Sequence, residues 1–267
     1  MSVGTSITSE LRDDGICVVT MDRPPVNALP VQGWSDLATA LDEAGADDAT
    51  KVVVLRAEGK GFNAGVDIKE MQNTTGFDAL IGANRGCYAA FKAVYECAVP
   101  VIAAVQGFCL GGGVGLVGNS DIVVASDDAY FGVPEVNQGA LGAATHLARL
   151  VPQHLMRTLY FTARTIPAAD LLQYGSVFDV APRNQLDDLA LGLAADIAAK
   201  DGRVIRAAKE ALNGIDPIDV NRSYRFEQGF TMELNLMGVS DELRDAFVER
   251  QSAGTDKAKS QQAEGGR

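Results

Sequence analysis

Two glycine-containing stretches, each directly after an apolar run, constrain the fold of this chain more than any other feature. The run KVVVLRA at 51–57 precedes EGKGFNAGVDIKEM at 58–71, and VPVIAAVQG at 99–107 precedes FCLGGGVGLVGNSD at 108–121. Each pair predicts a strand, a glycine turn and the start of a short helix. The first N–H groups of a helix have no intrahelical partner and favour negative charge. Two such helix starts that face each other can hold one oxyanion between two N–H donors.

The second stretch also matches a dinucleotide-binding pattern, because Gly113, Gly115 and Gly118 spell G-x-G-x-x-G. A nicotinamide-binding fingerprint requires a full crossover helix after the last glycine and an acidic residue about 20 positions later. Here the polar residues 119–121 would interrupt the required helix soon after Gly118, and Asp127 comes too early in the chain to be the acidic residue of the fingerprint. The pattern therefore argues against a nicotinamide oxidoreductase. A plainer alternative is that the glycines only permit close packing of neighbouring elements.

The rest of the chain indicates an α/β protein followed by a helical region. Val- and Ile-rich runs predict strands at 15–21, 51–57, 99–107, 121–127 and 175–181, and apolar spacing predicts amphipathic helices at 33–47 and 77–97. We expect one core over residues 1–200 and a helical arm over 201–250 that docks on the core or on a neighbouring subunit. Residues 251–267 contain no large apolar side chain, which predicts a disordered tail.

Charge and composition exclude several classes of partner. The net charge of -12 argues against a nucleic-acid surface or an anionic membrane surface, and no apolar run approaches the length of a spanning helix. A cytoplasmic enzyme is the plainest interpretation. The cysteines lie in apolar neighbourhoods, which predicts buried reduced thiols. With only two histidines, His146 and His154, and no ligand spacing for zinc, we expect no metal.

Four segments in this order resemble the crotonase superfamily, the enoyl-CoA hydratase and isomerase fold. They are FNAGVDIKEM at 62–71, VQGFCLGGGVGL at 105–116, SDIVVASDDAYFGVPEV at 120–136 and GALGAATHLARLVP at 139–152. The resemblance implies a spiral core of ββα units with a C-terminal helical region. It also implies acyl-CoA thioester substrates, no cofactor beyond the coenzyme A of the substrate, and a homotrimer or a hexamer.

The same resemblance implies roles for individual residues. It assigns an oxyanion hole to the backbone N–H groups of Val66 and Gly112, which agrees with the expected pair of helix starts. It assigns substrate and coenzyme A contacts to residues of the two glycine loops, the segment RPPVNAL at 23–29 and the segment around Pro-Glu: Pro25, Val26, Ala64, Asp67, Ile68, Gly111, Pro134 and Gly139. A tight turn alone would also explain the two prolines in RPPVNAL.

One carboxylate of the family pattern is missing. Family hydratases carry two glutamates, and the matching positions here are Gly115 and Glu135. Glycine cannot exchange a proton, so simple hydration of an enoyl-CoA is disfavoured. Glu135 remains as the expected base, with a pKa raised by desolvation in an apolar pocket. His146 is a second candidate that could orient a water, although a structural role for this histidine is the stronger expectation.

One base and one oxyanion hole permit two reactions. The base can move a proton between carbons, as a Δ3,Δ2-enoyl-CoA isomerase does, or it can activate water to break a carbon–carbon bond. Longer runs at 56–72, 83–109, 115–126, 139–157 and 198–213 resemble the actinobacterial crotonases of steroid breakdown, which implies hydrolytic ring opening of a bicyclic dione carboxyl-CoA. A non-catalytic scaffold is the remaining alternative.

The helix expected at 77–97 carries one further set of candidates. Arg85, Tyr88, Phe91 and Tyr95 are spaced three and four apart, which could place them on one helical face. Such a face could form an aromatic wall for a fused ring. It is equally possible that these four side chains pack in the protein core or at an interface between subunits.

Overall fold

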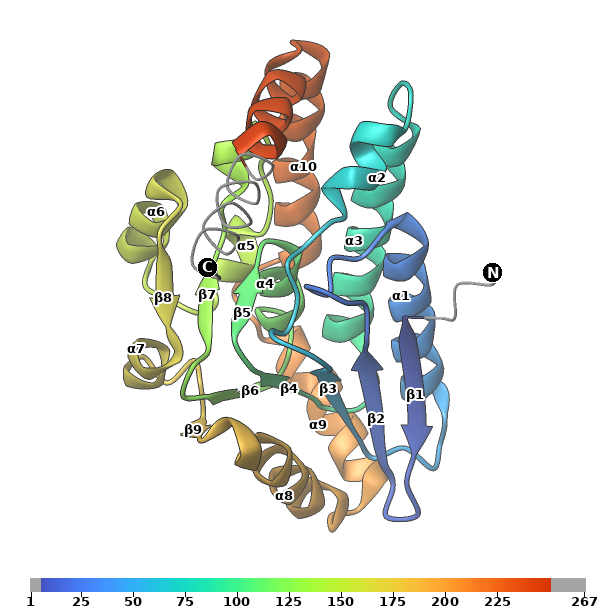
Figure 1. Cartoon of the computed structure of the whole chain (residues 1–267). Helices are drawn as coiled ribbons and strands as arrows, with labels where there is room; N and C mark the ends of the chain where they lie inside the picture. Colours follow the sequence, from blue (N-terminus) through green and yellow to red (C-terminus); the bar gives the residue numbers. More distant parts are fainter. Residues whose placement is uncertain (1–5, 251–267) are drawn as a thin grey trace, which may run out of the picture.

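The computed structural model describes residues 6–250, so the tail predicted at 251–267 lies outside the described residues. A six-stranded sheet in the order β1-β2-β3-β4-β6-β9 forms its centre (Figure 1). β1 (Ile7–Leu11) pairs antiparallel with β2 (Ile16–Met21). The remaining strands run parallel, namely β3 (Val52–Ala57), β4 (Val101–Val105), β6 (Ile122–Ser126) and β9 (Asp179–Ala181).

The parallel strands are apolar at consecutive positions because helices cover both faces of the sheet. Helix α8 (Leu186–Ala198) covers one face, while α1 (Val31–Ala46) and α3 (Asp78–Glu96) belong to the core on the other. Successive side chains of one strand therefore pack into two different apolar cores, one on each face of the sheet. Those that pack with α8 include Val52, Val54, Ile102, Ala104 and Val124, and those of the opposite face include Val53, Leu55, Val101, Ala103 and Val105.

A second, three-stranded sheet in the order β5-β7-β8 stands beside the first. β5 (Phe108–Leu110) leads into the short helix α4 (Gly112–Val117), and β7 (Tyr130–Gly132) leads into the 3-10 turn η1 (Glu135–Gln138). The first glycine loop ends in α2 (Ile68–Asn73). The small sheet is completed by β8 (Thr165–Pro167) and flanked by α5 (Ala144–Leu147), α6 (Gln153–Thr162) and α7 (Ala168–Gln173), and η2 (Arg183–Gln185) precedes α8.

The chain closes with α9 (Gly202–Gly214), α10 (Val220–Leu236) and a last helix over residues 239–250. One face of α10 is buried against α3 and α5, and Tyr224 is its large aromatic contact. The other face is exposed, with Phe226 at 71% and Met237 at 73% exposure. The arm thus docks through only part of its apolar surface within one chain.

Most expected elements are present, with differences at their ends. The run at 175–181 forms a strand only from Asp179, because Gly175 adopts a φ of 74° in a turn. The three-residue strands β5, β7 and β8 and the exposed strand β1 lack a clear period-two signal and were not predicted. All four cysteines are buried, as expected. Within residues 6–250, no helix combines the length and apolar character needed to cross a membrane.

Candidate active site

The two glycine loops lie against each other, as the sequence predicted. Phe62 N donates to Phe108 O at 2.9 Å, and Leu110 N donates to Asn63 O at 2.9 Å. A Cβ atom on Gly65 would lie 3.3 Å from the backbone nitrogen of Gly112. These contacts bring Val66, which precedes α2, next to the first residue of α4.

The backbone N–H groups of Val66 and Gly112 are available to a ligand. Leu29 N donates to Gly65 O, and Asp67 N donates to Leu29 O. The strand-like pairing with Leu29 therefore uses the two neighbours of Val66 and does not engage the N–H of Val66 itself. Gly112 is the first residue of α4 and has no intrahelical partner for its N–H. Among the hydrogen bonds of residues 6–250, none has either N–H as its donor.

A cavity of about 1000 Å³ opens beside these two groups. Eight of the predicted residues line it: Val26, Ala64, Val66, Ile68, Gly111, Gly112, Pro134 and Glu135. Most other lining side chains are apolar, and the charged ones among the described lining residues are Glu135, Arg244 and Arg250. A largely apolar cavity with a few polar groups is typical of a small-molecule site.

The structure places four other predicted residues outside the lining. Pro25 is exposed in the turn before α1. Asp67 caps α2 by accepting from Lys69 N, and it pairs with Arg23 at 3.1 Å. Gly139, with a φ of 63°, ends η1 and faces Ser240 of the last helix. His146 is buried outside the lining as well.

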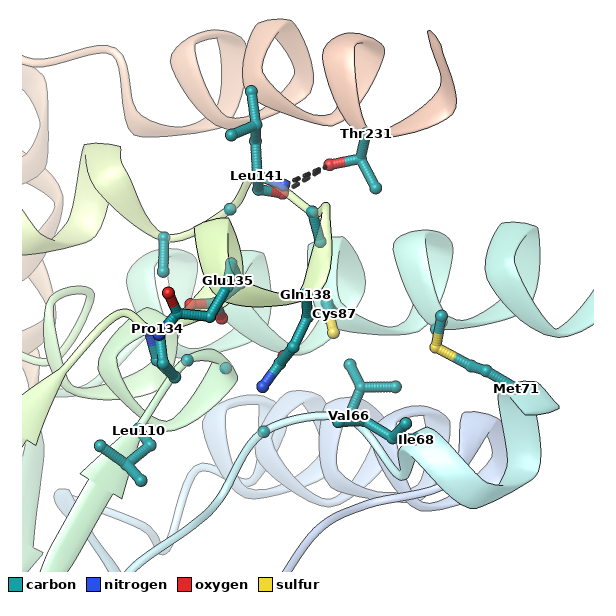
Figure 2. Close-up of a pocket in the computed structure, with 18 of the residues that line it drawn as sticks. Val66, Ile68, Met71, Cys87, Leu110, Pro134, Glu135, Gln138, Leu141 and Thr231 are labelled. Atoms are coloured by element: carbon teal, nitrogen blue, oxygen red, sulfur yellow. Dashed lines mark hydrogen bonds between the residues drawn. The ribbon is translucent and has the colours of Figure 1, made fainter. Parts of the chain in front are cut away.

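Glu135 begins η1 and extends its carboxylate into the cavity (Figure 2). Its Oε2 atom is buried without a hydrogen-bond partner. A Cβ atom on Gly111 would lie 2.3 Å from Glu135 Oε1, so only glycine at position 111 leaves room for the carboxylate. Desolvation, reinforced by the charge of Glu227, raises the pKa of Glu135 to about 8. A carboxyl group with this pKa can both accept and donate a proton near neutral pH.

Glu227 of α10 is a second carboxylate near the site that the sequence did not reveal. Its oxygens accept from the backbone N–H groups of Ala144 and Thr145 at 3.0 and 2.6 Å, and from the hydroxyl of Thr145. Burial raises the pKa of Glu227. Its oxygens are occupied at the start of α5 and it does not line the cavity, so its influence on Glu135 is electrostatic.

The position of the missing glutamate is filled by another side chain. A Cβ atom on Gly115 would lie 2.2 Å from Cζ of Phe91, and 2.4 and 2.6 Å from the two Cε atoms. Phe91 is buried, packs edge-on against Trp34 at 5.7 Å, and lines the cavity. The site therefore lacks both the second carboxylate and the space for one.

His146 lies behind this ring and not in the cavity lining. Its imidazole contacts Phe91 and Tyr224, each at a centroid distance of 4.9 Å, and its Nδ1 atom has no partner. Desolvation lowers the pKa of His146 to about 3, with a smaller contribution from Arg149. The imidazole is accordingly neutral at physiological pH.

Of the four residues expected on one face of α3, only Phe91 lines the cavity. Arg85 is exposed, the guanidinium of Arg225 stacks on Tyr88, and Tyr95 packs near Arg149. The helix thus uses most of this set for packing and surface contacts.

Several lining residues carry polar groups that the sequence analysis missed, among them Cys87, Gln138, Tyr224 and Thr231. Only Gln138 had a usable signal, its position three residues after Glu135. The others come from α3 and α10, which pack together only in the folded chain. Across residues 6–250, no three His, Cys, Asp or Glu side chains gather into a group that could hold a metal ion.

Comparison with known proteins decides the family. A family model described as enoyl-CoA hydratase/isomerase matches residues 12–254. The chain belongs to the enoyl-CoA hydratase/isomerase family. The crotonase fold predicted from the sequence is confirmed, and the family places this chain among enzymes of acyl-CoA thioesters.

Two relatives have sequences that are largely identical to this chain. One from Mycobacterium tuberculosis is 70% identical over 91% of this chain and 99% of its own length, and one from Rhodococcus jostii is 68% identical over 91% and 94%. Both are named (7aS)-7a-methyl-1,5-dioxo-2,3,5,6,7,7a-hexahydro-1H-indene-carboxyl-CoA hydrolase. A crystal structure of an enoyl-CoA hydratase/isomerase from Pseudoalteromonas atlantica superposes with a TM-score of 0.81 at 27% identity, covering 92% of this chain and 97% of that one.

Proposed function

We propose that this protein hydrolyses a carbon–carbon bond in a ring of a bicyclic dione carboxyl-CoA of steroid breakdown. The observation that carries the proposal is the asymmetry of the site. One buried carboxylate, Glu135, shares the cavity with two free N–H groups, and Phe91 occupies the space of a second carboxylate. The two relatives named for this activity support the choice of substrate.

The named substrate has ketones at ring carbons 1 and 5 and a methyl group on carbon 7a. In our proposal Glu135 takes a proton from water while the water oxygen bonds to carbon 1. The bond between carbons 1 and 7a then breaks, and carbon 1 becomes a carboxylic acid that releases its proton to solvent. The electron pair left on carbon 7a passes through the conjugated ring system to the thioester, whose oxygen the N–H groups of Val66 and Gly112 hold. Glu135 returns its proton to carbon, so one water is consumed.

The coenzyme A arm would lie along the loop residues that line the cavity, Val26, Ala64 and Ile68, and the acyl group would extend past Gly111 and Pro134. Arg250 supplies positive charge on the same lining, which suits phosphate groups, whereas Arg244 is already paired with Asp241 and Asn235. The coenzyme A of the substrate is the only cofactor in this proposal. His146 would support Phe91 and Tyr224 and would not contact the substrate.

A second candidate function is Δ3,Δ2-enoyl-CoA isomerisation. Glu135 is the only carboxylate among the described lining residues, and its pKa near 8 also suits a proton shuttle between two carbons. The two functions differ in whether an oxygen atom from water enters the product.

We propose further that the protein works in the cytoplasm as a homotrimer or a hexamer. The apolar face of α10 that one chain leaves exposed supports an assembly, because a free helix rarely exposes so many large apolar side chains. Phe226, Phe230, Leu236 and Met237 are all at least 40% exposed. Light scattering coupled to gel filtration would measure the mass, and a monomer at micromolar concentration would refute this part.

Mass spectrometry in oxygen-18 water tests the main proposal. The enzyme is offered the bicyclic dione carboxyl-CoA and a 3-enoyl-CoA in parallel, together with the Glu135→Gln variant. Glu210→Gln on the exposed side of α9 is the matched control. We expect a product heavier by one labelled water from the dione, lost only in Glu135→Gln. A conjugated enoyl-CoA of unchanged mass, with no labelled product from the dione, would instead assign the isomerase.

A further inference from the structure

The proposed ring opening needs two sets of hydrogen-bond donors. Negative charge develops first on the oxygen of the ring ketone that water attacks, and then on the thioester oxygen. The N–H groups of Val66 and Gly112 can serve only one of these positions at a time. If the ketone oxyanion had no hydrogen-bond donor of its own in this apolar cavity, nothing would stabilise the charge that develops when water attacks.

Two polar side chains of the lining are already engaged. Thr231 Oγ1 accepts from Leu141 N at 2.9 Å and donates to Leu141 O at 2.6 Å (Figure 2). The ring of Tyr224 is held between Phe91 and His146, at centroid distances of 5.0 and 4.9 Å. Neither group is free to turn toward a substrate without breaking these contacts.

Gln138 differs in that no hydrogen bond of its carboxamide is found among the described residues. It is the last residue of η1, which Glu135 begins. Residues three apart in a 3-10 turn lie above one another, so both side chains leave η1 on the same side. Figure 2 shows the Gln138 amide reaching into the cavity toward the loop that carries Val66.

The turn that carries both groups is fixed to the rest of the protein. Gly139 N and Ala140 N both donate to Glu135 O, and Asn137 N donates to Pro134 O at 3.0 Å. Ser240 of the last helix donates to Gly139 O at 2.5 Å. A side chain on such an anchored turn can hold a constant position relative to Glu135.

We propose that Gln138 is a catalytic residue whose carboxamide N–H donates to the oxygen of the attacked ring ketone, an inference that rests on the proposed function. Glu135 accepts a proton from water, the water oxygen bonds to the ketone carbon, and the carbonyl electron pair moves onto the oxygen held by Gln138. When the carbon–carbon bond breaks, that oxygen becomes part of the new carboxylate. The released electron pair passes to the thioester oxygen, which Val66 and Gly112 hold.

Two reactions in the same cavity should therefore depend on different residues. Ring opening requires Glu135, the two backbone N–H groups and Gln138. Exchange of the carbon-bound proton of the ring-opened product with deuterium oxide requires Glu135 and the backbone N–H groups alone. Loss of one oxyanion donor lowers kcat by about 10²–10³-fold in well-studied enzymes.

The test compares both reactions in Gln138→Met, which keeps an unbranched side chain of similar length, and in Gln138→Leu. Gln153→Leu on the exposed start of α6 is the matched amide control. We expect kcat for ring opening to fall about a hundredfold in both position-138 variants, with KM and product exchange within about threefold of the parent. The circular dichroism melting curve shows whether each variant is folded.

Three results would overturn the role of Gln138. Unchanged ring opening would remove it from the reaction. An equal fall in ring opening and product exchange would show that it only positions Glu135, and a rise in KM with kcat unchanged would show that it only binds the ground state. If the parent enzyme exchanges protons but never opens the ring, the proposed function itself fails, which is a different outcome from any of these.

Discussion

Substitution of Gly115 by alanine is expected to destabilise the protein, against the usual effect of this change in a helix. Alanine is favoured over glycine in a helix interior by up to about 1 kcal/mol. Here the new methyl group would lie 2.2–2.6 Å from three ring atoms of Phe91, well inside van der Waals contact. Phe91 is 2% exposed and is held by Trp34, His146 and Tyr224, so the ring has little room to move.

The net cost follows from the two opposing effects. Overpacking of a tight core costs about 1–3 kcal/mol, and this exceeds or cancels the helix preference. We expect Gly115→Ala to lower the free energy of unfolding by up to about 2 kcal/mol. Any movement of Phe91 would be directed into the cavity that it lines, so KM should rise as well.

A double-mutant cycle isolates this contact. Phe91→Leu removes the three ring atoms that clash and keeps an apolar side chain. In that background Gly115→Ala should become neutral or stabilising, with a coupling free energy above about 1 kcal/mol. Urea unfolding of the parent, both single variants and the double variant measures it. A stabilising effect of Gly115→Ala in the parent, or additive effects in the cycle, would refute the argument.

The same geometry bears on the missing glutamate. Gly115→Glu alone should give no efficient hydratase, because its carboxylate has no space beside Phe91. Strong crotonyl-CoA hydration by this variant would show that the cavity is otherwise suited to a hydratase.

Three further predictions concern charge. Since the base must be ionised, kcat/KM should rise with pH to a plateau above about 8, and Glu227→Gln should move this rise to lower pH; a flat profile between pH 6 and 9 would contradict the assignment of Glu135. Below pH 6.5 the lowered pKa of His146 opposes the effect of Glu135, but between 6.5 and the raised Glu135 pKa of about 8 the folded state binds more protons than the unfolded state, so the unfolding free energy should fall with rising pH there, and Glu135→Gln should weaken this dependence. Lys209→Met should cost about 3 kcal/mol in urea unfolding, because the buried ammonium contacts both oxygens of Asp121 at 2.7 and 2.8 Å, yet KM should be unchanged.

Local sequence pattern was sufficient to predict several parts of this protein. Val- and Ile-rich runs followed by glycine predicted the strands and turns that carry Val66 and Gly112, since strand formation and positive φ angles are set largely by neighbouring residues. Glu135, by contrast, was singled out only because Pro134-Glu135 matches a motif of the family that the sequence resembles. The resemblance to a family then connected these fragments into one fold, and the absence of a side chain at Gly115 already argued against hydration.

The way these pieces meet depends on tertiary packing. Phe91 fills the space at Gly115 because α3 packs against α4, and no spacing in the sequence encodes that contact. The same packing places His146 behind the aromatic side chains, outside the cavity, and brings Glu227 from the terminal arm close enough to raise the pKa of Glu135. These effects depend on distances between elements far apart in the chain, which is why the sequence identified Glu135 as a candidate base and only the fold showed its surroundings.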